Sequence, residues 1–181
     1  MKQHGPWQIV ESNEKYRDPW VTLTRDEVVR PDGKPGSYVV VTLKPGVCVL
    51  AVDDENNAYL TREFHYGVGC VTLEAVSGGI DGNEEPLVAA KRELQEEIGI
   101  EAAKWTDLGS TDPFTANVVS PTRMFLAEDL TFVETDPEGT ELIECVKLPF
   151  DEVVERVMDG TITHSPSCLT ILKTAFQQRD T

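Results

Sequence analysis

The stretch GGIDGNEEPLVAAKRELQEEIGI, residues 78–100, decides the fold. It reads as a glycine-rich loop followed by one helix, because Pro86 suits the first turn of a helix and Gly99 suits its C-terminal end. Apolar residues recur in the helix at three- and four-residue steps and predict one face packed on a core. These residues are Leu87, Ala90, Leu94 and Ile98.

Three glutamates lie on a different face of the same predicted helix. Glu93, Glu96 and Glu97 stand at i, i+3 and i+4, where like charges repel one another. A hard divalent cation would remove this repulsion, because Mg²⁺ prefers carboxylate oxygens. The other interpretation is an acidic helix face that only meets solvent.

The stretch resembles the Nudix box, G-x5-E-x7-R-E-U-x-E-E-x-G-U, in which U is an aliphatic residue. Every fixed position is matched, and average residue usage makes a chance match roughly one in 10⁹ per start position. The matching residues are Gly78, Glu84, Arg92, Glu93, Leu94, Glu96, Glu97, Gly99 and Ile100. The resemblance implies an α/β sandwich with a mixed sheet between helices. It also implies an enzyme that hydrolyses a nucleoside diphosphate linked to another moiety.

The resemblance assigns metal ligands within and just before the box. Glu93 and Glu97 are expected to be the main ligands, Glu96 to share the metal, and the carbonyl of Ser77 to complete the shell. Mg²⁺ is the expected cofactor, with Mn²⁺ as the alternative. Bound metal would neutralise the phosphate oxygens and activate a water molecule.

Other box residues are expected to support this chemistry. The guanidinium fork of Arg92, which we group with the catalytic residues, is expected to orient carboxylates such as that of Glu84. Gly78 is expected to lie against the substrate. Glu84 and Gly99 are expected to have structural roles.

The general base is expected in the acidic stretch ETDPEGTELI, residues 134–143. Relatives that act on ADP-ribose take their base from an acidic loop that follows the box and precedes a strand. Glu138 and Glu141 are the candidates, and Glu141 aligns better with the following strand. Two alternatives stay open: a box glutamate such as Glu96 is the base, or the stretch is an exposed acidic turn.

The segments before the box bear on the substrate. TREFHYGVG (residues 61–69) and LEAVSGGID (residues 73–81) are similar to ADP-ribose and nucleotide-sugar pyrophosphatases, and Glu74 matches a glutamate of theirs. His65 stands where these relatives often have an arginine. It either contacts phosphate or is a buried core residue, and Arg62 is the substitute cation.

Two further features bear on the choice of substrate. Trp20 resembles a tryptophan that some dimeric ADP-ribose hydrolases stack on adenine, a contact worth about 1–3 kcal/mol. The alternative for Trp20 is packing in the core or at an interface. The loop DPFTANVVSP, residues 112–121, departs from the Ser-Pro-Gly loop of the ADP-ribose branch.

The chain divides at its N-terminal end. Residues 1–44 alternate strand-like runs with turns and are expected to form a β extension, and residues 45–181 to form the Nudix domain. The extension is either plain edge structure or a homodimer interface that also lines the substrate pocket. Beyond it, the predicted strands are 47–52, 58–66, 68–76, 105–110, 123–127 and 142–148. The predicted later helices are 150–159 and 165–179, the last with Leu169, Leu172 and Phe176 on its apolar stripe.

Composition excludes several classes of function. The net charge of −16 over 181 residues, with no basic stripe, disfavours nucleic-acid binding. No apolar run approaches membrane-spanning length and no signal-peptide core is present, so we expect no membrane partner and a cytoplasmic enzyme. The cysteines are scattered and show no zinc-binding spacing. They are Cys48, Cys70, Cys145 and Cys168.

The sequence therefore predicts a Mg²⁺-dependent hydrolase that splits a nucleoside-diphosphate sugar, with ADP-ribose giving AMP and ribose 5-phosphate. Alternative substrates are GDP-mannose, UDP-glucose, dinucleoside polyphosphates and oxidised nucleoside triphosphates. A different class of answer is a Nudix module that binds ADP-ribose or NAD without turnover.

Overall fold

The computed structural model describes residues 1–135 and 142–179. The chain forms two compact units. Unit 1 comprises Met1–Pro45 and Asp112–Pro121, and unit 2 comprises Gly46–Thr111 and Thr122–Thr181. The segment 112–121 therefore belongs to unit 1, although the strands on either side of it belong to unit 2.

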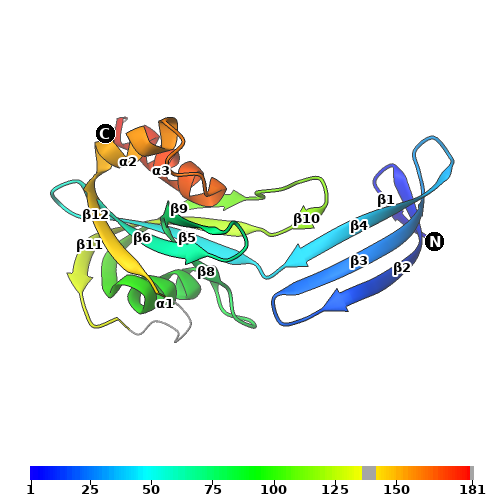
Figure 1. The fold of residues 1–181 in the computed structure, drawn as a ribbon, viewed down its shortest axis with the longest axis horizontal. Helices are drawn as coiled ribbons and strands as arrows, with labels where there is room; N and C mark the ends of the chain where they lie inside the picture. Colours follow the sequence, from blue (N-terminus) through cyan, green and yellow to red (C-terminus); the bar gives the residue numbers. More distant parts are fainter. Residues whose placement is uncertain (136–141, 180–181) are drawn as a thin grey trace. The chain divides into compact units, whose positions relative to one another are not determined.

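Unit 1 is a five-stranded sheet in the order β1-β2-β3-β4-β10. The first four strands are antiparallel to their neighbours, and the short β10 pairs with β4 in parallel. The strands are β1 (Lys2–His4), β2 (Trp7–Arg17), β3 (Val21–Val29), β4 (Pro35–Leu43) and β10 (Val118–Val119). Figure 1 shows β2, β3 and β4 side by side, in blue to cyan. The sequence predicted strand-like runs within residues 1–44, and the short β10 lies outside that range.

Unit 2 contains the larger, mixed sheet. Its order is β12-β6-β5-β11-β9, with β7 paired to β6 and β8 paired to β5. The strands are β5 (Gly46–Val52), β6 (Asn57–His65), β7 (Cys70–Glu74), β8 (Val76–Gly79), β9 (Ile100–Thr111), β11 (Thr122–Phe132) and β12 (Glu144–Pro149). Strands β11 and β5 run parallel, whereas the other pairs are antiparallel. The predicted single strand over 68–76 is two strands that pair with different neighbours.

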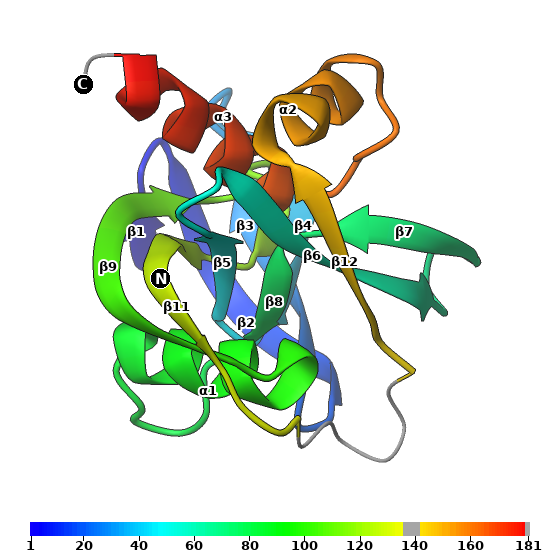
Figure 2. The same cartoon turned by 90° about the vertical axis from the view of Figure 1, so that its left-hand side faces the viewer.

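Helices cover both faces of this sheet. They are α1 (Pro86–Ile98), α2 (Phe150–Met158) and α3 (Ser165–Arg179). Figure 2 shows α1 on one side of the sheet and α2 and α3 on the other. This is the predicted α/β sandwich with a mixed sheet between helices.

The central strand β5 shows why its sequence is continuously apolar. Alternate side chains of a strand point to opposite faces, so a strand covered on both faces has no polar side. Cys48, Leu50 and Val52 join the core cluster that contains Phe150 of α2 and Ile171 of α3. Val47, Val49 and Ala51 join the cluster that contains four buried residues of α1. These are Ala89, Ala90, Leu94 and Ile98.

The predicted apolar stripes were partly wrong. Leu87 of α1 is exposed, and Ala89 takes its place in the core. In α3, Leu172 and Phe176 are 37% and 66% exposed, although the sequence placed both on the buried stripe. The buried face of α3 is instead formed by small and hydroxyl-bearing residues with one isoleucine. They are Pro166, Ser167, Thr170, Ile171 and Thr174.

Hydroxyl groups are tolerated on this buried face because they are hydrogen-bonded. Thr170 Oγ1 donates to the carbonyl of Pro166 at 2.7 Å, and Thr174 Oγ1 donates to the carbonyl of Thr170 at 2.9 Å. Such bonds to the preceding turn satisfy threonine inside a helix, so polarity does not force these residues outward.

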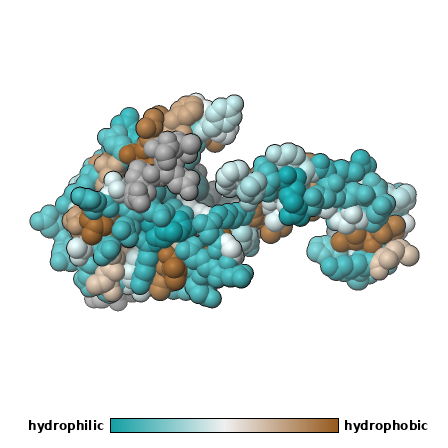
Figure 3. Space-filling view, turned by 90° about the horizontal axis from the view of Figure 1, so that it is seen from below, coloured by the Kyte–Doolittle hydropathy of each residue, from teal (hydrophilic) through white to brown (hydrophobic). Residues whose placement is uncertain are grey.

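Figure 3 shows hydrophilic residues over most of one face, interrupted by separate hydrophobic patches. Among the described helices, none combines the length and hydropathy that a bilayer crossing requires.

Candidate active site

The box helix α1 begins and ends where the sequence predicted. Pro86 is its first residue, and Glu85 precedes it in an extended conformation without a side-chain cap. Gly99 has φ +63°, a left-handed conformation that favours glycine, and its N–H donates to the carbonyl of Gln95 at 2.9 Å. These two ends fix the register of the helix and so the positions of its glutamates.

Arg92 is the centre of the box. Its Nη1 donates to Glu93 Oε1 at 2.8 Å and to Glu96 Oε2 at 2.9 Å. Its Nε and Nη2 donate to the two carboxylate oxygens of Glu84 at 3.3 and 3.2 Å, and Nη2 also donates to the carbonyl of Gly79 at 2.9 Å. The expected pairing of Arg92 with Glu84 is present. One guanidinium thus joins the loop before α1 to two box carboxylates.

The charges of this cluster reinforce one another. The guanidinium of Arg92 outweighs the effect of burial and holds the pKa of Glu84 below its usual range. In turn, hydrogen bonds to Glu84, Glu96 and Glu93 raise the pKa of Arg92 despite its partial burial. The carboxylate of Glu84 is therefore ionised near neutral pH and stays paired with Arg92.

Glu93 also lies against the backbone just before the box helix. A Cβ at Gly78 would lie only 1.9 Å from Glu93 Cδ, so the glutamate occupies the space that a side chain would need. Gly78 is held in place because β8 pairs with β5, in a register that sets Gly78 opposite Val47 and Ser77 opposite Cys48. The residues that the sequence assigned to substrate and metal are therefore neighbours here.

The oxygen atoms of the box carboxylates and of the nearby backbone are of the chemical type that a divalent cation needs, since Mg²⁺ prefers carboxylate and carbonyl oxygens. Within residues 1–135 and 142–179, no three His, Cys, Asp or Glu side chains form a group that could hold a metal. Arg92 Nη1 instead lies between Glu93 and Glu96. Metal binding by Glu93, Glu96, Glu97 and the Ser77 carbonyl therefore stays a prediction.

Glu74 is more buried than the sequence indicated. It is 9% exposed at the end of β7. Oε1 accepts from Thr72 Oγ1 at 2.6 Å and lies 3.2 Å from His65 Nε2, while Oε2 lies 3.0 Å from His164 Nδ1. Burial disfavours its ionised form, but the bonds from His164 and Thr72 and the charges of both histidines hold the pKa of Glu74 below its usual range.

The other predicted substrate contacts lie on the surface. His65 is half-buried beside Glu74, so it is not a core residue. Arg62 is exposed, and its Nη1 lies 3.4 Å from Glu144 Oε2. Trp20 is 66% exposed in unit 1, which excludes packing in the core of that unit. The candidate bases Glu138 and Glu141 lie outside the described residues.

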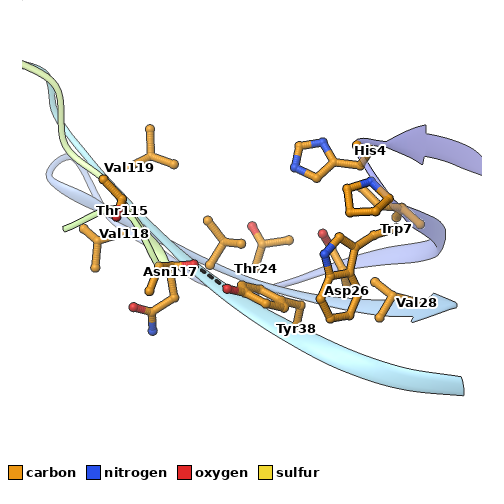
Figure 4. A pocket seen from close by; sticks show the side chains of 15 residues that line it. His4, Trp7, Thr24, Asp26, Val28, Tyr38, Thr115, Asn117, Val118 and Val119 are labelled. Atoms are coloured by element: carbon orange, nitrogen blue, oxygen red, sulfur yellow. Dashed lines mark hydrogen bonds between the residues drawn. The ribbon is translucent and has the colours of Figure 1, made fainter. Parts of the chain in front are cut away.

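Unit 1 has a pocket of its own. Its volume is about 730 Å³, within the usual range for small-molecule sites, and its lining includes residues of β2, β3, β4 and the 115–119 segment. The rings of Trp7 and Tyr38 meet edge to face with centroids 5.6 Å apart. The side chains of Thr24, Asp26 and Val28 project from β3 beside them, as Figure 4 shows. Tyr38 donates to the carbonyl of Ala116, which ties the 115–119 segment to the sheet.

Sequence reasoning missed several of these residues. Trp7, Tyr38, His164 and Ser167 were not singled out, and nothing in the local sequence marks the first three. Ser167 was detectable in part: a serine and two threonines at three- and four-residue steps along 165–179 form a polar stripe. Its partner Ala75 lies about ninety residues earlier, and only the fold brings the two together.

Comparison with known proteins agrees with this geometry. Residues 7–41 match the nucleoside diphosphate sugar hydrolase N-terminal domain, and residues 42–165 match the NUDIX domain. A crystal structure described as an ADP compounds hydrolase shares the fold, with a TM-score of 0.84 and 20% identity over 99% of this chain and 98% of that one.

Sequence relatives include enzymes. An ADP-ribose pyrophosphatase of Bacillus subtilis is 28% identical over 87% of this chain and 88% of its own length. An ADP-ribose pyrophosphatase of Mycobacterium tuberculosis is 27% identical over 95% of this chain and 84% of its own length. A CMP-5'-(N-acetyl-N-hydroxy-3-aminopropyl)phosphonate hydrolase of Streptomyces rubellomurinus is 29% identical over 84% of this chain and 74% of its own length. Given the NUDIX match over more than half of its residues, the chain belongs to the Nudix family and is a Nudix pyrophosphohydrolase.

Proposed function

We propose that this protein is a Mg²⁺-dependent hydrolase of nucleoside-diphosphate sugars, with ADP-ribose as its first substrate. Water attacks one phosphorus atom of the pyrophosphate, and the bond from that phosphorus to the bridging oxygen breaks. AMP and ribose 5-phosphate leave, and the protons of the water are taken up by a base and by the solvent. The reaction needs no oxidant and no co-substrate other than water.

The observation that carries this proposal is the Arg92 cluster. One guanidinium holds Glu84, Glu93 and Glu96 while its Nη2 binds the carbonyl of Gly79. Carboxylates at fixed positions next to backbone carbonyls are the donor set that a Mg²⁺–phosphate complex requires. A purely solvated acidic face would not need a shared arginine at its centre.

We propose Glu93, Glu97, Glu96 and the Ser77 carbonyl as the residues that hold the metal. Bound Mg²⁺ would neutralise phosphate oxygens and lower the pKa of a coordinated water. The protein's own contribution is position: Arg92 fixes two of the carboxylates, and Gly78, which has no side chain, leaves room for the carboxylate of Glu93. Mn²⁺ is the expected substitute.

The substrate assignment is supported by the N-terminal match and by the ADP-ribose pyrophosphatases among the relatives. The pocket of unit 1 suits a nucleobase better than a phosphate, because its lining has aromatic rings and an acid, Asp26, but no lysine or arginine. Trp20, His65 and Arg62 remain our candidates for contacts to base and phosphate. All three have exposed or half-buried side chains that a ligand can reach.

The base and the assembly are further parts of the proposal. We keep Glu141 as the first candidate for the base, Glu138 as the second and Glu96 as the alternative from the box. We also propose a cytoplasmic homodimer in which the extension of residues 1–44 contacts the second copy. A native mass equal to one chain at micromolar concentration would contradict the dimer without touching the chemistry.

The test is a product assay on the purified protein. ADP-ribose, UDP-glucose, GDP-mannose, a dinucleoside tetraphosphate and an oxidised nucleoside triphosphate are each incubated with Mg²⁺, with Mn²⁺ and with EDTA. We expect AMP and ribose 5-phosphate from ADP-ribose at the highest kcat/KM, and no product with EDTA. Faster turnover of another compound would make that compound the preferred substrate in place of ADP-ribose. Tight ADP-ribose binding with no product under either metal would establish a sensor instead.

A further inference from the structure

A second polar cluster lies on the other face of the sheet from α1. It joins the end of β7 to the first turn of α3, about ninety residues later in the chain. Its members are Glu74, His164 and Ser167, with Glu74 and Ser167 both buried. None of them belongs to the box, although β8, which leads into the box, begins only two residues after Glu74.

The contacts of His164 indicate that its Nδ1 carries a hydrogen. Its Nδ1 lies 3.0 Å from Glu74 Oε2 and 2.8 Å from Ser167 Oγ. An ionised carboxylate can only accept, so Nδ1 must carry a hydrogen and donate to Glu74. Ser167 Oγ then accepts from the same N–H. One N–H group of His164 therefore links Glu74 of β7 to Ser167 of α3.

Ser167 carries the connection to the backbone before the box. Its Oγ accepts a hydrogen bond from the N–H of Ala75 at 2.9 Å. The carbonyl of Ala75 in turn accepts from Ser77 Oγ at 2.9 Å. Both polar groups of the Ala75 peptide backbone are therefore held, one by α3 and one by Ser77. Movement of α3 would be transmitted to the residue whose carbonyl we assign to the metal.

The three side chains resemble a serine nucleophile with its histidine and acid, but the arrangement excludes that chemistry. In such a triad the serine and the carboxylate bind opposite nitrogens of the imidazole. Here both contact Nδ1, which already carries a hydrogen, so it cannot accept the serine proton as a general base. Ser167 is also fully buried and beyond reach of a substrate. The cluster therefore holds the neighbouring backbone in place and takes no part in a chemical step.

We propose that Glu74 is a positioning residue which, through His164 and Ser167, sets the backbone of residues 75–78 for metal binding by the box. This inference rests on the proposed function, since it concerns the same metal site. It replaces the substrate contact that the sequence assigned to Glu74 with an indirect role. Loss of the cluster should weaken the metal site and slow the chemical step more than it weakens ADP-ribose binding.

The first experiment measures Mn²⁺ affinity by electron paramagnetic resonance, without substrate, beside kcat and KM for ADP-ribose. Glu74→Gln and His164→Ala should weaken Mn²⁺ binding and lower kcat by about 2- to 30-fold, with a smaller change in KM. His164→Asn should restore both, because the asparagine amide can place a donor where Nδ1 lies. Glu152→Gln, the same chemical change on an exposed carboxylate of α2, is the control and should match the wild type.

Folded Glu74→Gln and His164→Ala proteins with wild-type Mn²⁺ affinity and kcat would overturn the inference. A second measurement needs no substitution. Because coupling is reciprocal, Mn²⁺ should slow amide hydrogen exchange in residues 73–77 and 164–170 of the wild type. Unchanged exchange in 164–170 at saturating Mn²⁺ would equally overturn it.

These outcomes separate the inference from the function on which it rests. Wild-type protein that binds no Mn²⁺ and yields no product contradicts the proposed function, and the positioning role with it. Wild-type protein that binds Mn²⁺ and hydrolyses ADP-ribose, with Glu74→Gln and His164→Ala unaltered, contradicts the positioning role alone.

Discussion

Glu93 fills the space that a side chain at Gly78 would occupy, with its carboxylate oxygens 2.1 and 2.4 Å from the position of a Cβ. The clashing atoms are the end of a flexible side chain, so Gly78→Ala can be accommodated if Glu93 swings away. We therefore expect a small stability loss, about 1 kcal/mol, but a loss of kcat of about 10- to 100-fold. Urea unfolding and steady-state kinetics together measure the two effects.

The matched control is Gly67→Ala. Gly67 has no atom within 4 Å of a Cβ and lies in the exposed β6–β7 turn, so the substitution should leave both quantities unchanged. An active Gly78→Ala protein would show that Glu93 is not needed in its present position.

Arg92→Lys keeps the charge of the central cation but loses its fork. A lysine cannot bind Glu84 through two nitrogens while also reaching Glu93, Glu96 and the carbonyl of Gly79. We expect kcat to fall about 10- to 100-fold and the free energy of unfolding to fall by about 1–3 kcal/mol.

Arg123→Lys is the comparison for this variant, because Arg123 pairs with Asp107 on the surface. An exposed pair of this kind is worth about 1 kcal/mol or less, and the substitution should leave kcat unchanged. Equal effects of the two substitutions would mean that Arg92 has no special role.

Acid stability should depend on Asp53. Burial opposes its ionisation, but Lys147 Nζ at 2.8 Å and hydrogen bonds from Asn57 and Tyr59 hold the pKa of Asp53 well below the usual 3.8. A lowered folded-state pKa means that the unfolded chain binds more protons in acid. The stabilisation is therefore complete above about pH 4.5 and is lost as the pH falls through the folded-state value.

Urea unfolding at pH 7 and pH 3 tests whether stability falls on acidification as this pKa shift predicts. Asp53→Asn should lose about 1–3 kcal/mol at pH 7 and should lose less on acidification than the wild type does. Glu55→Gln, on the exposed neighbour of Lys147, should behave like the wild type. An Asp53→Asn protein with the wild-type acid profile would contradict the assignment.

The buried face of α3 can be decided by one pair of substitutions. Ile171 is fully buried, whereas Leu172 is 37% exposed. Ile171→Ala should therefore cost about 2–5 kcal/mol of unfolding free energy, and Leu172→Ala less than about 1.5 kcal/mol. A larger loss of unfolding free energy for Leu172→Ala than for Ile171→Ala would instead support the apolar stripe that the sequence predicted for α3.

The box was readable from the sequence because its information is local. Pro86, Gly99 and the glutamate spacing define one helix, and its ends lie where they were predicted. The sandwich class followed from strand and helix patterns of the same kind. The continuous apolar run of β5 likewise reflects burial on both faces, which the sequence pattern already indicated.

The errors have physical causes. Hydrophobic periodicity fails in α3 because the threonines satisfy their hydroxyls within the helix, leaving Leu172 and Phe176 outside. The cluster of Glu74, His164 and Ser167 depends on a contact between distant segments, and no local pattern encodes it. Membership of 112–121 in unit 1 likewise depends on pairing of β10 with β4.

Glu97→Gln tests the central claim, which is that the carboxylates of α1 hold the metal for pyrophosphate hydrolysis. The substitution keeps the shape of the side chain and removes its charge. ADP-ribose hydrolysis is measured with Mg²⁺ beside Gln95→Ala, a change at an exposed position of the same helix. We predict that Glu97→Gln is folded and loses at least about 100-fold in kcat, while Gln95→Ala stays active. A folded Glu97→Gln protein that hydrolyses ADP-ribose at the wild-type rate would contradict the account.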